Sequence, residues 1–220
     1  MSMEEKEYIE TTREPIGEKV LKAASSILSA IFPPFMVPFV SFLLLFLFTY
    51  LAFMPLPYKA VVLGVVYLFT ICIPMLSIYL YQRFCGKGIR ELQERKKRFI
   101  PYGLAAISYC ACAIILYRLY VPRPLSAIVI ATLFCMLLCG LINLKWKIST
   151  HTANGGMLVG GLLSYSALFN FNPVGWLCGF ILLSGLLGTA RIILKQHSLL
   201  EVIVGFIVGM FCGIIGILFI

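Results

Sequence analysis

Residues 174–220 read VGWLCGFILLSGLLGTARIILKQHSLLEVIVGFIVGMFCGIIGILFI, which is two apolar runs joined by a short polar stretch at 190–201. Each run is long enough to cross about 30 Å of hydrocarbon as a helix. The polar stretch holds Arg191, His197 and Glu201 within about three helical turns. Glu201 is the only acidic residue in the second half of the chain, and His197 is one of two histidines. Charges this rare, kept together at the end of a membrane span, usually serve a function.

The composition is that of a polytopic membrane protein. Of the 220 residues, 61% are hydrophobic and 12% are charged, and the mean hydropathy is +0.99. A soluble domain has about 45–50% apolar and about 25% charged residues. No stretch is polar enough to form a soluble domain. We therefore predict a polar and interfacial segment at 1–34, followed by a single membrane domain at 35–220.

The apolar runs predict an all-α fold, a polytopic helical membrane bundle. About seven transmembrane helices are expected, and six are possible because the fifth run is close to the lower length limit. An amphipathic pattern at 15–32 predicts a further helix that lies at the membrane interface. The expected spans are approximately 35–54, 60–81, 102–120, 125–144, 153–169, 174–190 and 200–220.

Glycines recur at every fourth position in two of the late spans. Gly205, Gly209 and Gly213 have this spacing in the last span, and Gly156 and Gly160 repeat it in the fifth. Small residues at such positions let helix backbones approach closely inside a bilayer. We therefore attribute these glycines to helix packing and assign them no chemistry.

Counting the spans predicts that three polar clusters share one face of the membrane. With seven spans, the loops after the second, fourth and sixth emerge on the same side. They carry Arg98, then Ser149 and His151, then Arg191 and His197. Residues far apart in the sequence are therefore expected at one site.

The distribution of basic residues predicts the orientation of this face. Of the 18 lysines and arginines, only Lys59, Arg118 and Arg123 fall on the opposite side. By the positive-inside rule, the face with the polar clusters would be cytoplasmic. The net charge of +9 is carried by these loops, so it indicates anionic membrane lipids as partners and argues against nucleic acid.

The residue types in the clusters suit phosphoryl transfer without a metal or another cofactor. His197 and Glu201 are four residues apart, so on a helix the carboxylate can hold one imidazole nitrogen and aim the other. Arg191 offers a guanidinium fork that matches phosphate geometry. His151 lies where the fifth span begins, and free backbone amides at a helix start also favour an anion.

These motifs resemble those of the type 2 phosphatidic acid phosphatase family, which is related to the vanadium haloperoxidases. The family's third motif reads Ser-Arg-x5-His-x3-Asp, and residues 190–201 read ARIILKQHSLLE. The arginine, the histidine and their spacing match, and glutamate replaces aspartate. The second motif, Pro-Ser-Gly-His, is similar to ISTH at 148–151. The serine and the histidine are kept, whereas the proline and the glycine are not.

The first family motif, Lys-x6-Arg-Pro, has the weakest counterpart. Arg98 can stand for the arginine, but the next proline is Pro101 and the lysine position holds Glu91. The missing lysine contact with phosphate could come from another cation near the site. The candidates are Lys97, Arg95 and Lys147.

The resemblance implies a role for each matched residue. His197 would be the nucleophile that forms a phosphohistidine, His151 the general acid, and Glu201 the residue that orients the nucleophile. The substrate would be a lipid phosphate or diphosphate, such as phosphatidate, phosphatidylglycerol phosphate, an isoprenyl diphosphate or a phosphorylated glycolipid. Family members usually place the site on the extracytoplasmic face of the cell membrane. The residues expected to bind the phosphate are Arg191, Arg98, Ser149 and Lys147.

Two other classes of function fit the same residues. His151, His197 and Glu201 make a plausible ligand set for zinc, which would give a zinc-dependent membrane hydrolase. The altered first motif is also what a catalytically inactive lipid-phosphate-binding or transport protein would show. The sequence leaves the oligomeric state open.

Overall fold

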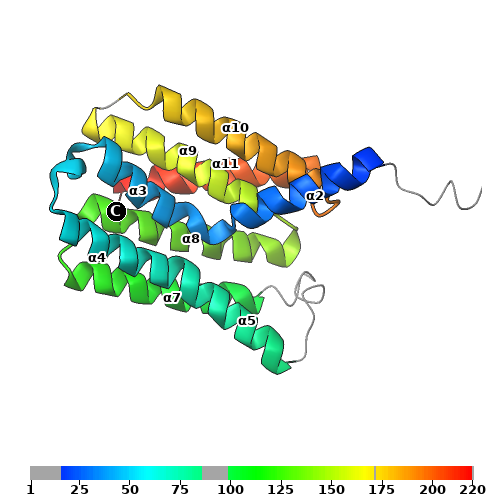
Figure 1. Cartoon of the computed structure of the whole chain (residues 1–220), viewed down its shortest axis with the longest axis horizontal. Coiled ribbons are helices and arrows are strands. Elements are labelled where there is room, and N and C mark those ends of the chain that lie inside the picture. The colour runs from blue at the N-terminus through cyan, green and yellow to red at the C-terminus, as the bar shows by residue number, and fades with distance from the viewer. Residues whose placement is uncertain (1–15, 86–98, 171, 220) are drawn as a thin grey trace, which may run out of the picture.

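The computed structural model describes residues 16–85, 99–170 and 172–219, and every element in this part of the chain is a helix. The helices form an elongated bundle in which most axes run roughly along its long direction (Figure 1). The predicted all-α fold is therefore confirmed. The elements in order are α2 (Ile16–Ile31), η1 (Pro34–Met36), α3 (Val37–Phe48), η2 (Tyr50–Phe53), α4 (Leu56–Tyr67), η3 (Leu68–Cys72), α5 (Ile73–Cys85), α7 (Phe99–Arg118), α8 (Arg123–Lys145), α9 (Thr150–Phe169), α10 (Val174–Ile193) and α11 (Leu199–Phe219).

Four helices of the described part are long and apolar enough to cross a membrane. Two shorter apolar helices, Val37–Phe48 and Gly103–Arg118, accompany them. α9 is absent from the four because its threonines, glycines, serines and asparagine lower its hydropathy. Membrane character is thus supported, and the count of about seven spans stays a prediction. The four helices are Leu56–Tyr81, Arg123–Lys145, Val174–Ile193 and Leu199–Leu218.

The tightest contact in the bundle is between α9 and α11, and glycines make it possible. A Cβ atom added at Gly209 would overlap the backbone carbonyl of Ala153, and one at Gly156 would overlap that of Phe206. Gly160 and Gly213 likewise face backbone atoms of the opposite helix, and Gly205 faces the carbonyl of Ser149 just before α9. The predicted role of these glycines in close packing is confirmed.

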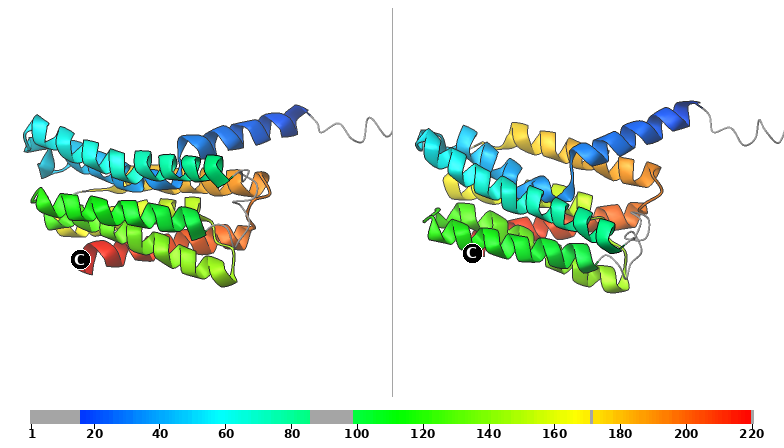
Figure 2. Two further views of the ribbon diagram at one scale, coloured as in Figure 1. Left: turned by 90° about the horizontal axis from the view of Figure 1, so that it is seen from below. Right: turned by 60° about the horizontal axis from the view of Figure 1, so that its bottom comes forward.

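Two apolar clusters surround this contact. One joins α8, α9 and α11 and includes Cys139, Ile148 and Met157. The other joins α3, α4, α7 and α8 and includes Phe42 and Tyr109. α9 therefore lies inside the bundle, with α8, α10, α11 and α3 around it (Figures 1 and 2).

Helix α2 lies within the amphipathic stretch at 15–32 and packs against α10. It runs roughly along the bundle and extends past the end at which α10 and α11 are joined (Figure 2). Val20 and Ile27 on α2 remain 62% and 60% exposed. A position of α2 at the membrane interface stays a prediction, and the first part of the predicted 1–34 segment lies outside the described residues.

We predict that Gly209→Ala destabilises the bundle, because its methyl group meets the Ala153 backbone, which cannot move aside. Overpacking of this kind costs about 1–3 kcal/mol. The matched control is Gly185→Ala on α10, where nothing lies within 4 Å of an added Cβ. Thermal unfolding in detergent should show a lower midpoint for Gly209→Ala only. Equal midpoints for the two variants would contradict the glycine contact.

Candidate functional site

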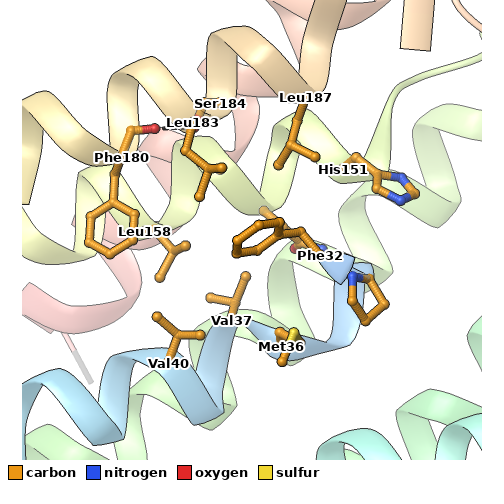
Figure 3. Close-up of a pocket in the computed structure, with 13 residues that line it drawn as sticks. Phe32, Met36, Val37, Val40, His151, Leu158, Phe180, Leu183, Ser184 and Leu187 are labelled. Atoms are coloured by element: carbon orange, nitrogen blue, oxygen red, sulfur yellow. Dashed lines mark hydrogen bonds between the residues drawn. The ribbon is translucent and has the colours of Figure 1, made fainter. Parts of the chain in front are cut away.

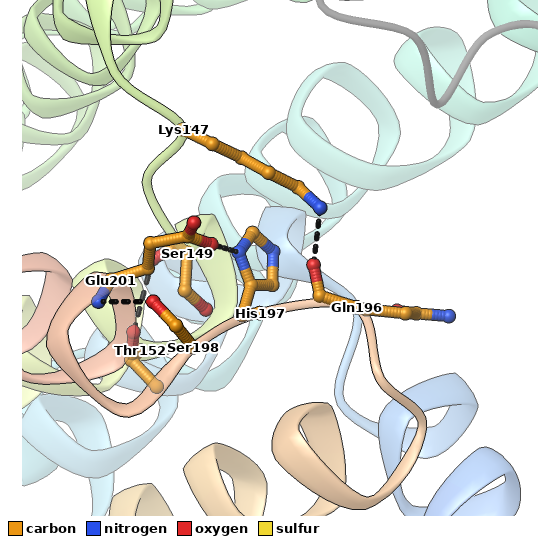
Figure 4. A network of polar contacts seen from close by, with 7 residues as sticks. All are labelled: Lys147, Ser149, Thr152, Gln196, His197, Ser198 and Glu201. Atoms are coloured by element: carbon orange, nitrogen blue, oxygen red, sulfur yellow. Dashed lines mark hydrogen bonds and ion pairs between the residues drawn. The ribbon is translucent and has the colours of Figure 1, made fainter.

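The α8–α9 linker and the α10–α11 linker meet at one end of the bundle. The backbone N–H of Ser149 donates to the carbonyl oxygen of Glu201 at 3.3 Å. The Lys147 ammonium donates to the backbone carbonyl of Gln196 (Figure 4). Two of the three polar clusters that the span count placed on one face are therefore in direct contact.

The same contact brings two helix N-termini together. α9 begins at Thr150 and α11 at Leu199, and both run away from this end of the bundle (Figure 1). Each N-terminus carries free backbone N–H groups and roughly half a positive charge from the helix dipole. Two such ends side by side favour a bound anion.

A tight turn after α10 places His197 beside the last turn of that helix. The carbonyl oxygen of Arg191 accepts from the backbone N–H groups of Gln196 and His197, at 3.0 and 3.4 Å. Lys195 makes the turn possible by adopting a left-handed backbone with a φ of 52°. The chain from Arg191 to His197 therefore folds back on itself, and the two residues are neighbours in space.

His197 and Glu201 form the hydrogen-bonded pair that their spacing predicts. The distance between His197 Nδ1 and Glu201 Oε2 is 2.7 Å (Figure 4). The sequence analysis placed both residues on one helix. This is only partly right, because His197 precedes α11 and only Glu201 lies in its first turn. With a carboxylate as acceptor, Nδ1 carries the proton, and Nε2 keeps its lone pair.

Ser198 caps the start of α11 and fixes the pair. Its hydroxyl accepts from the Glu201 backbone N–H at 3.4 Å, which is half of the Ser-x-x-Glu capping box. The Glu201 carboxylate binds the imidazole instead of closing the box. Its place in the first turn also lets the helix dipole stabilise its negative charge.

Burial and neighbouring cations keep His197 neutral. Only 8% of the residue is exposed, and desolvation lowers the pKa of its imidazole from 6.5 to about 4. The hydrogen bond to Glu201 raises this pKa, whereas the positive charges of Lys147 and Arg191 lower it. At neutral pH the side chain is therefore an uncharged base with Nε2 unprotonated, as a nucleophile must be.

Ser149 is fully buried, and its hydroxyl has no hydrogen-bond partner among the described residues. It occupies the N-cap position of α9 but does not cap the helix with its side chain. Its backbone is held at both ends, since its carbonyl oxygen accepts from the Thr152 hydroxyl at 3.0 Å. A buried hydroxyl without a hydrogen-bond partner costs free energy. A ligand that forms a hydrogen bond with Ser149 would remove this cost.

His151 lies two residues further on, in the first turn of α9. It lines a pocket between α3, α9 and α10 whose other walls are mostly apolar (Figure 3). His151 therefore lies at the same end of the bundle as His197. Arg191 is half-buried in the last turn of α10. Arg98 and the rest of the first motif lie outside the described residues.

Three members of the network were missed by the sequence analysis. Ser198 could have been found from the Ser-x-x-Glu pattern at the start of the last span. Thr152 and the backbone carbonyl of Gln196 carry no comparable signal, because their contacts depend on how the two linkers meet.

The arrangement does not assemble the zinc set that the sequence left open. Within residues 16–85, 99–170 and 172–219, no three side chains of His, Cys, Asp or Glu are grouped so that they could hold a metal ion. His151, His197 and Glu201 all lie within this part of the chain. The described site therefore offers an anion a neutral imidazole and two cations, and offers a divalent metal no complete ligand set.

No family model matches the chain, and no curated protein or solved structure is significantly similar to it.

We predict that acid destabilises the protein through His197. Its pKa is lower in the folded chain, so between pH 6.5 and about 4 only the unfolded chain takes up this proton. Above pH 6.5 the neutral imidazole makes its full contribution to the free energy of unfolding. As the pH falls toward 4 this contribution is lost, and the loss is at most about 3 kcal/mol. The unfolding midpoint of His197→Gln should therefore fall less between pH 7.5 and pH 4.5 than that of the unmodified chain. An equal fall in both proteins would contradict this pKa.

Proposed function

We propose that this protein is an integral membrane phosphatase that hydrolyses a phosphate or diphosphate ester of a lipid, as members of the type 2 phosphatidic acid phosphatase family do. The observation that carries the proposal is His197. It is buried, uncharged, held at Nδ1 by Glu201 and flanked by Lys147 and Arg191. This is the environment that an imidazole needs in order to attack phosphorus while nearby cations neutralise the phosphate.

The proposed reaction has two steps. Nε2 of His197 attacks phosphorus, the bond between phosphorus and the leaving oxygen breaks, and His151 gives its proton to that oxygen. Water then attacks the phosphohistidine as His151 takes a proton from it. The nitrogen–phosphorus bond breaks, and inorganic phosphate leaves. Glu201 stabilises the positive charge that builds up on the imidazole in the first step.

The cations have a separate task in this proposal. The transferred phosphoryl group spreads negative charge over three oxygens. In this proposal Arg191, Lys147 and the unpartnered hydroxyl of Ser149 face that charge. Arg98, which lies outside the described residues, is proposed to join them from its place in the sequence. Hydrogen bonds that become stronger in the transition state raise the reaction rate. Hydrogen bonds that are equally strong in the bound substrate and in the transition state do not.

A lipid substrate follows from where the site lies in a membrane bundle. The reactive residues are at the ends of helices that are compatible with membrane spans. In a bundle of about seven spans, which we propose, these helix ends would lie at the depth of lipid headgroups. Phosphatidate, phosphatidylglycerol phosphate, an isoprenyl diphosphate and a glycolipid phosphate all present a phosphate at this depth. An inactive lipid-phosphate-binding or transport protein is the second candidate, favoured by Glu91 at the lysine position of the first motif.

The expected membrane face can be tested by labelling. The charge count favours a cytoplasmic site, whereas the family resemblance favours an extracytoplasmic one. Lys195 is exposed in the α10–α11 turn, so Lys195→Cys in a cysteine-free chain gives a label beside the site. Reaction of intact cells with a membrane-impermeant maleimide would place the site outside the cytoplasm.

We predict that the purified protein releases phosphate from at least one of these lipids, and that a chelator does not abolish release. His197→Ala should lower kcat by at least about 10³-fold, since it removes the nucleophile. Glu201→Gln should lower it by roughly 10²- to 10⁴-fold by losing the tautomer control. Phosphate release is measured with a panel of lipid phosphates.

Arg118→Ala, at the opposite end of the bundle, is the matched control and should keep full activity. Loss of activity on chelation, with recovery on adding zinc, would contradict the metal-independent mechanism. Release from no lipid at all would favour the inactive binding protein.

A further inference from the structure

Two adjoining cavities lie along one side of α9. The first is between α3, α9 and α10, and the second continues along α9 toward Tyr165. Three residues line both cavities, namely Val37 of α3, Leu158 of α9 and Phe180 of α10. We call the two together the α9 groove.

The α9 groove follows a single face of its helix. The lining residues of α9 recur at intervals of three and four, which places them on one side of the helix. From His151 to Tyr165 there are 14 residue steps, or about 21 Å at 1.5 Å per step. The α9 residues that line it include His151, Asn154, Leu158, Leu162 and Tyr165.

Polarity along the α9 groove is uneven. His151 and Asn154, in the first two turns of α9, contribute polar groups near the end of the bundle that carries His197, and Ser184 adds a hydroxyl opposite Gly155. Beyond them the walls are largely aliphatic and aromatic, as Figure 3 shows for Leu158, Phe180 and Leu183 on one side and Val37 and Val40 on the other. An occupant would therefore have a polar end near His151 and a long apolar body.

We propose that the α9 groove holds one hydrocarbon chain of the phosphorylated lipid, extended along α9 with its headgroup at the His151 end. This inference rests on the proposed phosphatase function, because the headgroup position comes from it. Charge complementarity supports the choice of occupant. The polar end is two residues from Ser149, whose backbone bonds Glu201, and the Lys147 and Arg191 cations lie beside His197 at that end.

The expected effect is on substrate orientation more than on affinity. In a bilayer, a chain gains little by moving from lipid to an apolar groove, because both surroundings are equally apolar. A chain held along α9 instead fixes the direction from which the phosphate reaches His197, and such positioning raises the rate of the chemical step. The groove should therefore favour long-chain over short-chain substrates in kcat/KM.

The test compares Leu158→Trp, which fills the junction of the two cavities, with Leu163→Trp, an exposed position on the same helix. Phosphate release is measured with long-chain and short-chain phosphatidate. We expect Leu158→Trp to remove the long-chain preference, with roughly tenfold loss for the long chain and little change for the short chain. Leu163→Trp should retain the preference. Leu158→Phe, a smaller block, covers the case in which the tryptophan variant does not fold.

A second readout needs no turnover. Phosphatidate with a photoreactive diazirine in one chain is irradiated with the protein, and the labelled peptides are mapped by mass spectrometry. Labels on α3, α9 and α10 at Val37, Leu158 and Phe180, lost in Leu158→Trp but kept in Leu163→Trp, support the α9 groove. Labels spread equally over outward faces, or equal labelling of both variants, would overturn it.

The two readouts separate the groove from the proposed function. Labels in the groove without phosphate release from any lipid would leave the groove in place and defeat the phosphatase. Phosphate release with no chain-length preference and no groove label would keep the phosphatase and defeat the groove.

Discussion

The backbone contact between α9 and α11 is the constraint on which the site depends. Glycines on both helices have no side chain to hold the helices apart. The backbone of Ala153 can therefore lie directly against Gly209. Because both helices begin at the same end, the close contact also sets their N-termini side by side. The hydrogen bond from the Ser149 N–H to the Glu201 carbonyl then ties the two starts together. Packing in the middle of the bundle thus fixes the geometry of polar groups at its end.

His197 shows how opposing electrostatic effects leave a neutral but oriented base. Burial and the charges of Lys147 and Arg191 disfavour the imidazolium, while the Glu201 carboxylate favours it. Burial and the two cations outweigh the carboxylate, so the pKa of His197 falls. The carboxylate still determines which imidazole nitrogen carries the proton. As an anionic phosphate approaches Nε2, its charge would offset that of the two cations. In the proposed reaction, the site would therefore offer an unprotonated Nε2 before the phosphate binds and would support positive charge on the ring afterwards.

The features predicted from the sequence are those set by local spacing and composition. Glycine spacing predicted close helix packing, and the four-residue interval predicted the pair of His197 and Glu201; both are confirmed. Features that arise where two distant segments meet could not be predicted in this way. The buried hydroxyl of Ser149, the left-handed turn at Lys195 and the contact of Lys147 with the Gln196 carbonyl depend on the relative placement of the linkers. The role of Arg98 stays a prediction, since it lies outside the described residues.

The low hydropathy of α9 has a physical reason in this arrangement. A helix that faces lipid all round needs large apolar side chains, but most of α9 is covered by α3, α8, α10 and α11, so its faces can serve different contacts. Gly156 and Gly160 give α11 a close approach on one face, and Leu158 and Tyr165 line the α9 groove on another. Its first turn presents His151 to the end of that groove. In the proposed phosphatase, the same helix would therefore set both the position of the headgroup and the direction of the lipid chain, and substrate orientation would depend on the packing of the bundle.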